Sequence, residues 1–407
     1  MSIRDSDIYF YLQRMKLIYV LLVLMVIKTN SSAQSKSYIL ARTTGSLPFL
    51  EYGIGDDRLG GAKMTYLDSN ILLKVTDSFK TDYKVQLSQY HFAYIAKESV
   101  KLLKKESAVS NHNNNTSNSW KVYGDSLFDY IAISLNERLP YSSRQLINPS
   151  KITVDLFGVT TNTNWVTQLK TAKEIKNAWY EQPEDDVLRV NIELKHTQHW
   201  GYSIYYDSLL TKLIIKVKRQ PNIADIKKLR IAIDAGHGGE NSGATGVTSF
   251  ILEKDYTLLM AKQLEAALKK AGIKNVFMTR KIDTTLDMPE RIMMLRKFNP
   301  DFLISIHLNS ASVDSVKGTS TYYRYIGFRP LSVSILNQML SLKLNEYGNV
   351  GHFNFALSGP TDYPNCLVEV AFLSNKEDEK KILSQVFRKA VAQKIYAGIQ
   401  DWLKTIK

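Results

Sequence analysis

The chain has 407 residues, of which 44% are hydrophobic and 23% are charged, and its formal net charge is +14. This length is enough for two or three domains with their own cores, and the composition excludes wholesale disorder. The positive charge suits an anionic partner such as a nucleic acid, a membrane surface or an acidic polymer. Because no basic run is interleaved with aromatic residues, we expect no nucleic-acid partner.

The N-terminus has the pattern of an export signal. Two basic residues flank the start of an apolar run over residues 17–27, which is too short for a membrane span and has the length of a signal-peptide core. Small residues follow, so we expect a signal peptide over residues 1–33 that is cleaved after Ala33, with Met15 as a second candidate for the start. No later segment has the pattern of a transmembrane helix. The predicted location is therefore the periplasm or the cell envelope.

The first half of the chain has the pattern of β structure. Residues 35–106 contain short alternating strands separated by turn residues, and we expect a small β domain that resembles a bacterial SH3-like barrel. Residues 107–119 are polar and rich in asparagine, which predicts a linker. Residues 120–220 contain further alternating strands, among them KITVDLFGV and KLIIKVKR, and predict a second β domain.

From about residue 228 to residue 407 the pattern changes to alternating strands and helices. The strand RIAID is followed by a stretch with leucine and alanine at helical spacing, which Gly272 ends. Strands separated by helices predict a mainly parallel sheet with helices on both faces. The predicted fold class is thus an α/β catalytic domain preceded by one or more β-rich domains.

Four residues of this segment are candidates for a functional site, although each has a plainer explanation when taken alone. His237 lies in a glycine-rich turn that matches no phosphate-binding motif. Glu253 begins a predicted helix, where the helix dipole stabilises a carboxylate by roughly 0.3–1 kcal/mol. His307 lies near the end of an apolar strand, where a lone histidine is more often a hydrogen-bonded core residue. Glu369 lies inside the apolar strand CLVEVAFL, where an unpaired carboxylate is costly to bury unless the strand is at an edge.

Together, the four residues indicate a metal-dependent hydrolase. Three of them lie at or just after the carboxyl ends of strands, and these ends converge on one crevice in an open α/β sheet. Two imidazoles and one carboxylate form a three-ligand zinc set that leaves a fourth position for water. A further glutamate beside that water is the general base that a hydrolase needs.

The same segment resembles the zinc-dependent N-acetylmuramoyl-L-alanine amidases of the Amidase_3 family. The resemblance is carried by AIDAGHGGENSGATG, LEKDYTL, MTR, DFLISIHLNS and CLVEVAFLSN in this order. It implies one Zn²⁺ bound by His237, Glu253 and His307, with Glu369 as the catalytic residue. It also gives supporting roles in folding or substrate contact to three further residues: Arg280, Arg291 and Asn309. The strands ITVDLFG and DVLRVNIEL within residues 120–220 resemble the AMIN domain that localises such enzymes, with an unrelated β spacer as the alternative.

The resemblance implies a peptidoglycan hydrolase that cleaves the amide bond between N-acetylmuramic acid and L-alanine. Some family members carry an inserted helix that plugs the site until an activator removes it. The segment before CLVEVAFL is short, so we expect no such helix and no need for an activator. Asn241 stands where an acidic residue is common, and we expect little effect because it is not a ligand.

The remaining candidate residues receive other interpretations. His352 is the closest rival as a metal ligand or substrate contact. Cys366 is three residues before Glu369 and on the opposite strand face, so we interpret it as packing; a single cysteine forms no internal disulfide. The histidines of the β-rich half are expected to be unrelated to catalysis: His91, His112, His196 and His199. Three alternative functions remain open, namely a zinc hydrolase of another cell-wall bond, a catalytically silent wall-binding protein and an adhesion module.

Overall fold

The computed structural model describes residues 38–55, 60–104, 115–207 and 212–406. The expected signal segment over residues 1–33 lies outside these residues, as does His112. Residues Ile39–Lys407 form one compact unit. Within the described ranges, no helix is both long and apolar enough to cross a membrane.

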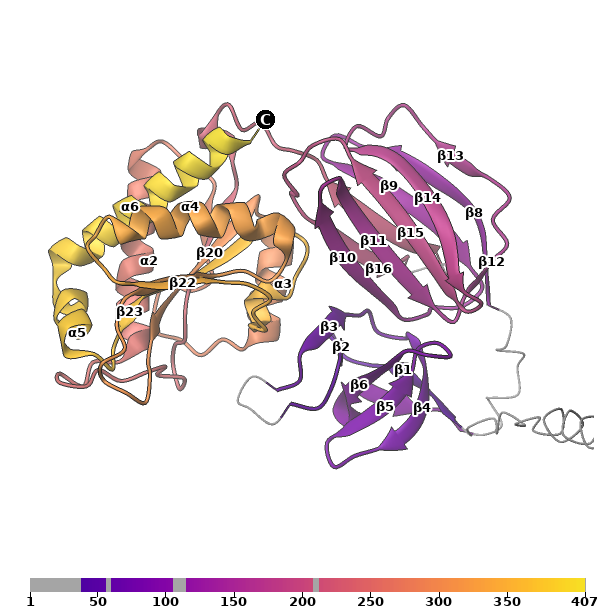
Figure 1. Cartoon of the computed structure of the whole chain (residues 1–407), viewed down its shortest axis with the longest axis horizontal. Coiled ribbons are helices and arrows are strands. Elements are labelled where there is room, and N and C mark those ends of the chain that lie inside the picture. Colours follow the sequence, from indigo (N-terminus) through magenta and orange to yellow (C-terminus); the bar gives the residue numbers. More distant parts are fainter. Residues whose placement is uncertain (1–37, 56–59, 105–114, 208–211, 407) are drawn as a thin grey trace, which may run out of the picture. The chain divides into compact units, whose positions relative to one another are not determined.

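The first β-rich region is a seven-stranded antiparallel sheet in the order β3-β2-β6-β5-β4-β1-β7 (Figure 1). Its strands are β1 (Ile39–Thr43), β2 (Phe49–Glu51), β3 (Lys63–Tyr66), β4 (Leu72–Ser78), β5 (Asp82–Gln86), β6 (Phe92–Ala96) and β7 (Val100–Leu102). Short alternating strands are present as expected for this segment, among them β4, β5 and β6. Alternation of side chains directs Val85, Ala93 and Ile95 into the core, where they are fully buried.

The second β-rich region consists of two sheets. One has the order β10-β11-β15-β14, and the other has the order β12-β8-β9-β17-β16 with β13 beside β8. The strands are β8 (Thr116–Gly124), β9 (Phe128–Leu135), β10 (Tyr141–Ile147), β11 (Ser150–Phe157), β12 (Thr160–Thr161), β13 (Val166–Gln168), β14 (Ile175–Glu184), β15 (Val187–Leu194), β16 (Tyr202–Tyr206) and β17 (Lys212–Lys218). Apolar residues of both sheets share one core cluster, which also includes residues of the first β-rich region such as Leu50 and Val85.

The boundary of the expected linker over residues 107–119 is wrong at its C-terminal end. Residues 115–119 are described, and β8 already begins at Thr116. Ser117 is fully buried, and its hydroxyl group lies 3.0 Å from that of Thr163. Polar side chains in this stretch are therefore compatible with a strand, because hydrogen bonds satisfy the hydroxyl group that the strand buries.

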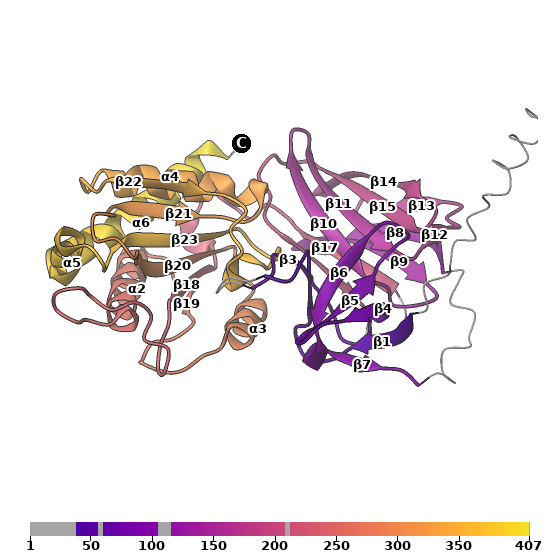
Figure 2. The ribbon, with the colours of Figure 1, turned by 60° about the horizontal axis from the view of Figure 1, so that its bottom comes forward.

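The C-terminal region alternates strands and helices. After a short 3-10 helix, η3 (Ile226–Lys228), its elements are β18 (Ile231–Ala235), α2 (Glu253–Lys270), β19 (Val276–Met278), α3 (Met288–Phe298), β20 (Phe302–Asn309), β21 (Thr319–Tyr322), η4 (Ile326–Phe328), α4 (Arg329–Leu340), β22 (Glu346–Val350), η5 (Ala356–Ser358), β23 (Asn365–Phe372), α5 (Lys376–Leu383) and α6 (Gln385–Thr405). The sheet order is β19-β18-β20-β23-β21-β22, and Figure 2 shows the six strands side by side.

This sheet is mixed. Strands β19, β18, β20 and β23 run parallel, whereas β21 is antiparallel to β23 and β22 is parallel to β21. Two strands, β21 and the edge strand β22, therefore depart from the parallel arrangement that the strand–helix alternation predicts. No helix separates β20 from β21, so the crossover that a parallel neighbour requires is missing from that connection.

Helices cover both faces of the sheet. Helices α2, α4 and α6 bury apolar residues against one face, in a cluster with Ile233, Ile306 and Val368. Helix α3 packs against the other face, where Ile292 and Leu295 contact a cluster with Leu303. Side chains alternate along a strand, so β20 directs His307 to the α3 side and Ile306 to the other. The candidate site residues of β20 and β23 lie on the α3 side.

Candidate metal centre and active site

The turn after β18 presents His237 to the site. His237 has a φ of 60°, and the adjacent Gly238 has a φ of 133°, so the chain reverses sharply. Gly236 is required for a second reason: a Cβ atom there would lie 2.4 Å from Cε1 of His307. The glycines therefore let the turn approach the neighbouring strand closely enough to bring two histidines together, with ring centroids 4.9 Å apart.

Glu253, His237 and His307 form a compact cluster. Oε1 of Glu253 lies 3.0 Å from Nε2 of His237 and 3.1 Å from Nδ1 of His307. One ligand atom from each of the three residues lies within 4.8 Å of the others, and no other such trio of His, Cys, Asp or Glu occurs in the described ranges. The structure thus brings together the three expected metal ligands from the turn after β18, the first residue of α2 and β20.

The geometry of this cluster fits a zinc ion. Ligand atoms bound to tetrahedral zinc at about 2.0–2.1 Å are spaced roughly 3.3 Å apart, close to the separations found here. Nε2 of His307 is buried and makes no hydrogen bond, which is costly for a ring nitrogen unless another partner is present. In this orientation Nδ1 faces Glu253; a 180° rotation of the ring would exchange Nδ1 with Cδ2 and would bring Nε2 to the position that Cε1 now holds. The donor set of two imidazoles and one carboxylate is that of a catalytic zinc site.

Electrostatics keep the cluster ready to bind a cation. Burial raises the pKa of Glu253, but hydrogen bonds from His237 and His307 outweigh burial and hold that pKa well below its usual range. The carboxylate also accepts hydrogen bonds from backbone N–H groups: Leu308 donates to Oε1 at 2.9 Å and Ala244 to Oε2 at 2.8 Å. Glu253 is therefore ionised and fixed in orientation, and its side chain is only 4% exposed.

Asn241 orients the first histidine. Its Oδ1 atom lies 2.9 Å from Nδ1 of His237 and accepts the proton of that nitrogen, so Nε2 is the nitrogen that could bind a metal; when Nε2 carries a proton, it donates to Glu253 instead. The expectation that Asn241 matters little because it is not a ligand overlooked this contact. A polar residue four positions after a candidate metal-binding histidine, in the same turn, is the signal that could have identified it.

Glu369 lies beside the cluster on the adjacent strand. In the parallel pair β20–β23, Glu369 is the register partner of His307, and across the antiparallel pair β21–β23 it faces Ser320. Every other residue of β23 is buried, and Glu369 alone is partly exposed. The carboxylate is thus not wholly withdrawn from solvent, although its Oε2 atom is buried.

Two buried arginines stabilise the His237 turn by hydrogen bonds to its backbone oxygens. Arg291 is 1% exposed and donates to the backbone oxygen of His237 at 2.6 Å and to Oδ1 of Asp234 at 2.6 Å. Arg280 is 3% exposed and donates to the backbone oxygens of Ala235 and Gly236. Both side chains thus stabilise the conformation of the turn and do not project into the site.

Asp234 is a further residue of the region, and its role was not predicted from the sequence. It is 1% exposed and accepts hydrogen bonds from Thr279, Arg291 and Ser305. Burial raises its pKa, but Arg291 and the hydrogen bonds outweigh burial and lower that pKa. An acidic residue within the otherwise apolar strand RIAID is the signal that could have identified it.

Asn309 lies next to Tyr322, near Glu369. Its Nδ2 atom is 3.4 Å from the hydroxyl oxygen of Tyr322, and the Ser320 hydroxyl group is 3.3 Å from the same oxygen. Phe355 packs edge-on against the ring of His307, with centroids 5.3 Å apart. The site is therefore bordered by polar groups on the Glu369 side and by an aromatic ring beside His307.

The other histidines do not join the cluster. His352 lines a separate cavity of about 590 Å³ with Arg324 and Asn354. The described histidines of the β-rich half have local partners: His91 lies beside Ser88, His196 beside Glu174 and His199 beside Ser150. Cys366 is 1% exposed in the core on the opposite face of β23, which confirms that it is a packing residue.

Comparisons with known proteins give a family for this region. A sequence model of the Amidase_3 family, described as N-acetylmuramoyl-L-alanine amidase, matches residues 231–401. The N-acetylmuramoyl-L-alanine amidase AmiC of Escherichia coli O6:H1 is 26% identical over 368 residues, which cover 69% of this chain and 88% of that protein. The uncharacterized protein YqiI of Bacillus subtilis is 33% identical over 176 residues, which cover 42% of this chain and 84% of that protein.

A solved structure of a related protein gives a further match. The catalytic domain of CwlV, an N-acetylmuramoyl-L-alanine amidase from Bacillus (Paenibacillus) polymyxa var. colistinus, is 32% identical to this chain, with a TM-score of 0.42. The match covers 43% of this chain and 98% of that domain. The segment that the family model matches begins at β18 and ends within α6, so it contains His237, Glu253, His307 and Glu369. The chain belongs to the Amidase_3 family of N-acetylmuramoyl-L-alanine amidases.

Proposed function

We propose that this protein is a zinc-dependent peptidoglycan hydrolase that cleaves the amide bond between N-acetylmuramic acid and L-alanine. The observation that carries the proposal is the convergence of His237, Glu253 and His307 on one point, with Glu369 on the neighbouring strand. Family membership supports the choice of bond, because the relatives include proteins named as amidases of this type. A three-residue ligand set with an adjacent carboxylate is the arrangement that metal-assisted hydrolysis requires.

Each residue of the site has a distinct role in this proposal. A zinc ion bound by His237, Glu253 and His307 would supply an activated water molecule and a positive charge for the carbonyl oxygen. Glu369 accepts the proton of the attacking water and returns it to the departing L-alanine nitrogen. Asn241 keeps the imidazole of His237 in the tautomer whose Nε2 is free to bind.

In this proposal the substrate reaches the site without movement of a helix. Between β21 and β23 the chain contains one α-helix, α4, and its buried residues Leu331, Ile335 and Met339 pack on the face of the sheet opposite the site. We propose that the enzyme is active without an activator protein. The proposed location is the periplasm or cell envelope, because the substrate is found there, and the proposed role of residues 120–220 is wall binding like that of AMIN domains.

The experiment that tests this function is digestion of purified peptidoglycan by the full chain, with and without a chelator. The products are analysed by mass spectrometry. Free peptides that begin with L-alanine, absent after chelation and restored by Zn²⁺, are the expected result. Intact glycan–peptide linkages with cleaved peptides or cleaved sugars would instead indicate a hydrolase of another wall bond. Zinc binding without any product would favour a silent wall-binding protein or a requirement for an activator.

A further inference from the structure

The segment between β22 and η5 places two aromatic rings beside the candidate metal centre. Phe355 packs edge-on against the ring of His307, and Phe353 packs against the ring of Tyr322, with centroids 4.6 Å apart. The intervening Asn354 makes its contacts elsewhere, because successive side chains of an extended segment point to opposite sides. One side of this segment therefore faces the metal centre, and the other side is available for contacts with a different part of the chain.

Asn354 is bound to the first β-rich region. In the described sheet β3 is an edge strand, so its outer N–H and C=O groups have no strand partner there. The Oδ1 atom of Asn354 accepts a hydrogen bond from Lys63 N at 3.1 Å, and its Nδ2 atom donates to the backbone oxygen of Gly61 at 2.8 Å. Arg324 donates to the same Oδ1 atom at 3.2 Å and to the backbone oxygen of Lys63. Side chains of the C-terminal region thus take the place of a neighbouring strand beside β3.

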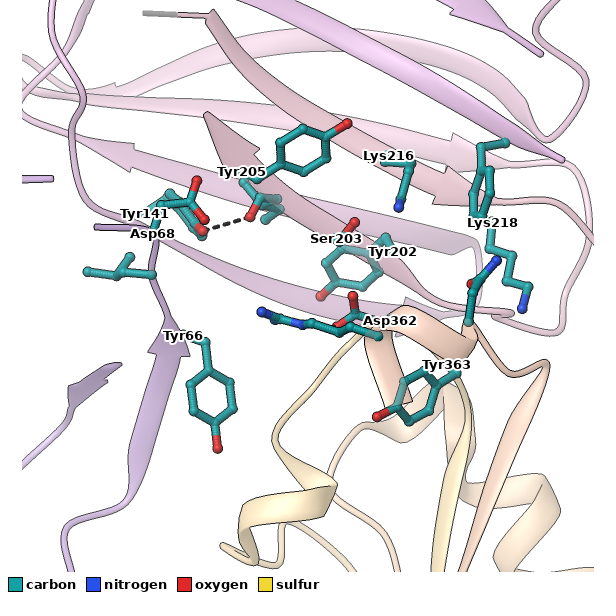
Figure 3. A pocket seen from close by; sticks show the side chains of 15 residues that line it. Tyr66, Asp68, Tyr141, Tyr202, Ser203, Tyr205, Lys216, Lys218, Asp362 and Tyr363 are labelled. Atoms are coloured by element: carbon teal, nitrogen blue, oxygen red, sulfur yellow. Dashed lines mark hydrogen bonds and ion pairs between the residues drawn. The ribbon is translucent and has the colours of Figure 1, made fainter. Parts of the chain in front are cut away.

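A tyrosine of β3 holds the next part of the same segment. The hydroxyl group of Tyr66 donates to the backbone oxygen of Ala356 at 3.2 Å, and Figure 3 shows the ring extending from β3 toward the C-terminal region. Among the described residues, the backbone N–H groups of residues 351–355 donate a single hydrogen bond, from Phe353 to the oxygen of Tyr323 at 3.2 Å. The contacts with β3 therefore contribute much of the hydrogen bonding that fixes this segment.

The orientation of His307 depends largely on packing. A metal-binding histidine is usually oriented by a hydrogen bond of its second ring nitrogen. Among the described residues, none forms a hydrogen bond with Nε2 of His307, while Nδ1 contacts Glu253. The ring is confined by the rings of Phe355 and His237 and by the backbone of Gly236, where a Cβ atom would lie 2.4 Å from Cε1. Displacement of Phe355 would therefore remove one wall of the space that holds this imidazole.

We infer that Asn354 is a positioning residue of the active site, through which β3 of the first β-rich region fixes the imidazole of His307. Asn354 acts through its neighbour Phe355, whose position depends on the hydrogen bonds between Asn354 and β3. The inference rests on the proposed function, which assigns His307 to the zinc ion. It gives residues 38–104, to which the proposed hydrolysis assigns no part, a role in organising the metal centre.

Zinc affinity tests the inference separately from hydrolysis. Two substitutions in the full chain loosen the contact from its two sides, Asn354→Ala in the C-terminal region and Tyr66→Phe in β3. Affinity is measured by competition with a chromogenic chelator. We expect it to fall about tenfold in Asn354→Ala, as for residues that orient a metal ligand, and about threefold in Tyr66→Phe, which loses one hydrogen bond. Because both substitutions release the same segment, the double variant should lose less affinity than the product of the two factors.

Matched controls make the same chemical changes at exposed positions. Asn177→Ala on β14 and Tyr90→Phe between β5 and β6 should bind zinc as the wild type does. Thermal unfolding of each zinc-free protein shows whether it is folded, and a merely structural role of Asn354 would lower the unfolding temperature without changing the zinc affinity of the folded chain. If Asn354→Ala does not fold, Tyr66→Phe decides the question.

The outcomes separate this inference from the proposed function. Wild-type zinc affinity in the folded variants overturns the inference, whereas peptide release by the wild type would still support the hydrolysis. Reduced zinc affinity in the variants of a chain that releases no peptide from the wall supports the inference and contradicts the proposed hydrolysis. A wild-type chain that binds no zinc overturns both.

Discussion

His307 of β20 and Glu369 of β23 are register partners on adjacent parallel strands, so both side chains project from the same face of the sheet. His307 also contacts Glu253, which begins the helix after the His237 turn. The ligand cluster and the proposed base are thus held by neighbouring backbone hydrogen bonds of one rigid sheet. This arrangement allows binding of a metal and transfer of a proton to be separated by mutation.

Replacing Glu369 by glutamine is expected to abolish most activity without loss of metal. General-base catalysis contributes typically about 10²–10⁴-fold, so kcat on wall fragments should fall by that factor. Zinc content, measured by mass spectrometry of the purified protein, should stay at one ion per chain, because Glu369 is outside the ligand cluster. The matched control is Glu377→Gln, whose carboxylate is 69% exposed on α5, and its activity should equal that of the wild type. Loss of zinc from Glu369→Gln would contradict the assigned role.

Substitution of a metal ligand is expected to remove zinc as well as activity, unlike Glu369→Gln. The substitutions are His237→Ala, Glu253→Gln and His307→Ala. Each removes one of three protein ligands, so bound zinc and activity should be lost together. Bound zinc stabilises the folded chain by mass action, and the wild type should therefore unfold at a higher temperature with Zn²⁺ than with a chelator. The three variants should show little of this shift. A variant with full zinc content would remove that residue from the ligand set.

The four site residues were predictable from sequence because each carries a local signal. His237 interrupts a glycine-rich turn, and Glu369 interrupts an apolar strand, so both depart from what their elements require. The succession of strands and helices along the α/β region also follows from the alternation of strand and helix patterns. The role of Asp234 could not be predicted, because it depends on hydrogen bonds to residues distant in the sequence, Thr279 and Ser305.

The direction of β21 and β22 could not be predicted for a similar reason. The strand pattern of residues 319–322 is the same whether the strand runs parallel or antiparallel, since the period of side chains is two in both cases. The absence of a helix between β20 and β21 was the one clue in the sequence. Likewise, the two β-rich regions share one apolar core and are joined by the ion pair of Arg42 with Glu137, and no local pattern reveals either contact.

Replacing Gly236 by alanine is expected to weaken metal binding without removing a ligand. The added Cβ atom would lie 2.4 Å from Cε1 of His307, so either the imidazole or the turn must shift. Zinc affinity, measured by competition with a chromogenic chelator, should fall at least about tenfold, as expected for a distorted metal site. Gly53→Ala is the matched control, because its Cβ meets no atom within 4 Å. Unchanged zinc affinity in Gly236→Ala would show that the turn tolerates the displacement.

Replacing Glu379 by glutamine is expected to destabilise the loop that precedes α2, in a pH-dependent way. The carboxylate of Glu379 accepts hydrogen bonds from Thr248 N at 2.9 Å, from Ser249 N at 2.8 Å and from the Ser249 hydroxyl group at 2.6 Å. Although burial raises its pKa, these bonds outweigh burial and lower the pKa below its ordinary value of 4.5.

A lowered folded-state pKa means that the carboxylate stabilises the fold at pH values above 4.5 and that this contribution is lost as the pH falls toward the folded-state pKa. Glu379→Gln should therefore unfold at a lower temperature than the wild type at pH 7, by an amount that corresponds to about 1.5–3 kcal/mol for hydrogen bonds to a charged group. The difference should shrink below pH 4.5. Glu377→Gln on the same helix, which alters an exposed ion pair, should show little change at either pH. Thermal melts of the three proteins from pH 7 to pH 3 measure this, and a constant difference across that range would mean that the Glu379 carboxylate does not stabilise the loop through its charge.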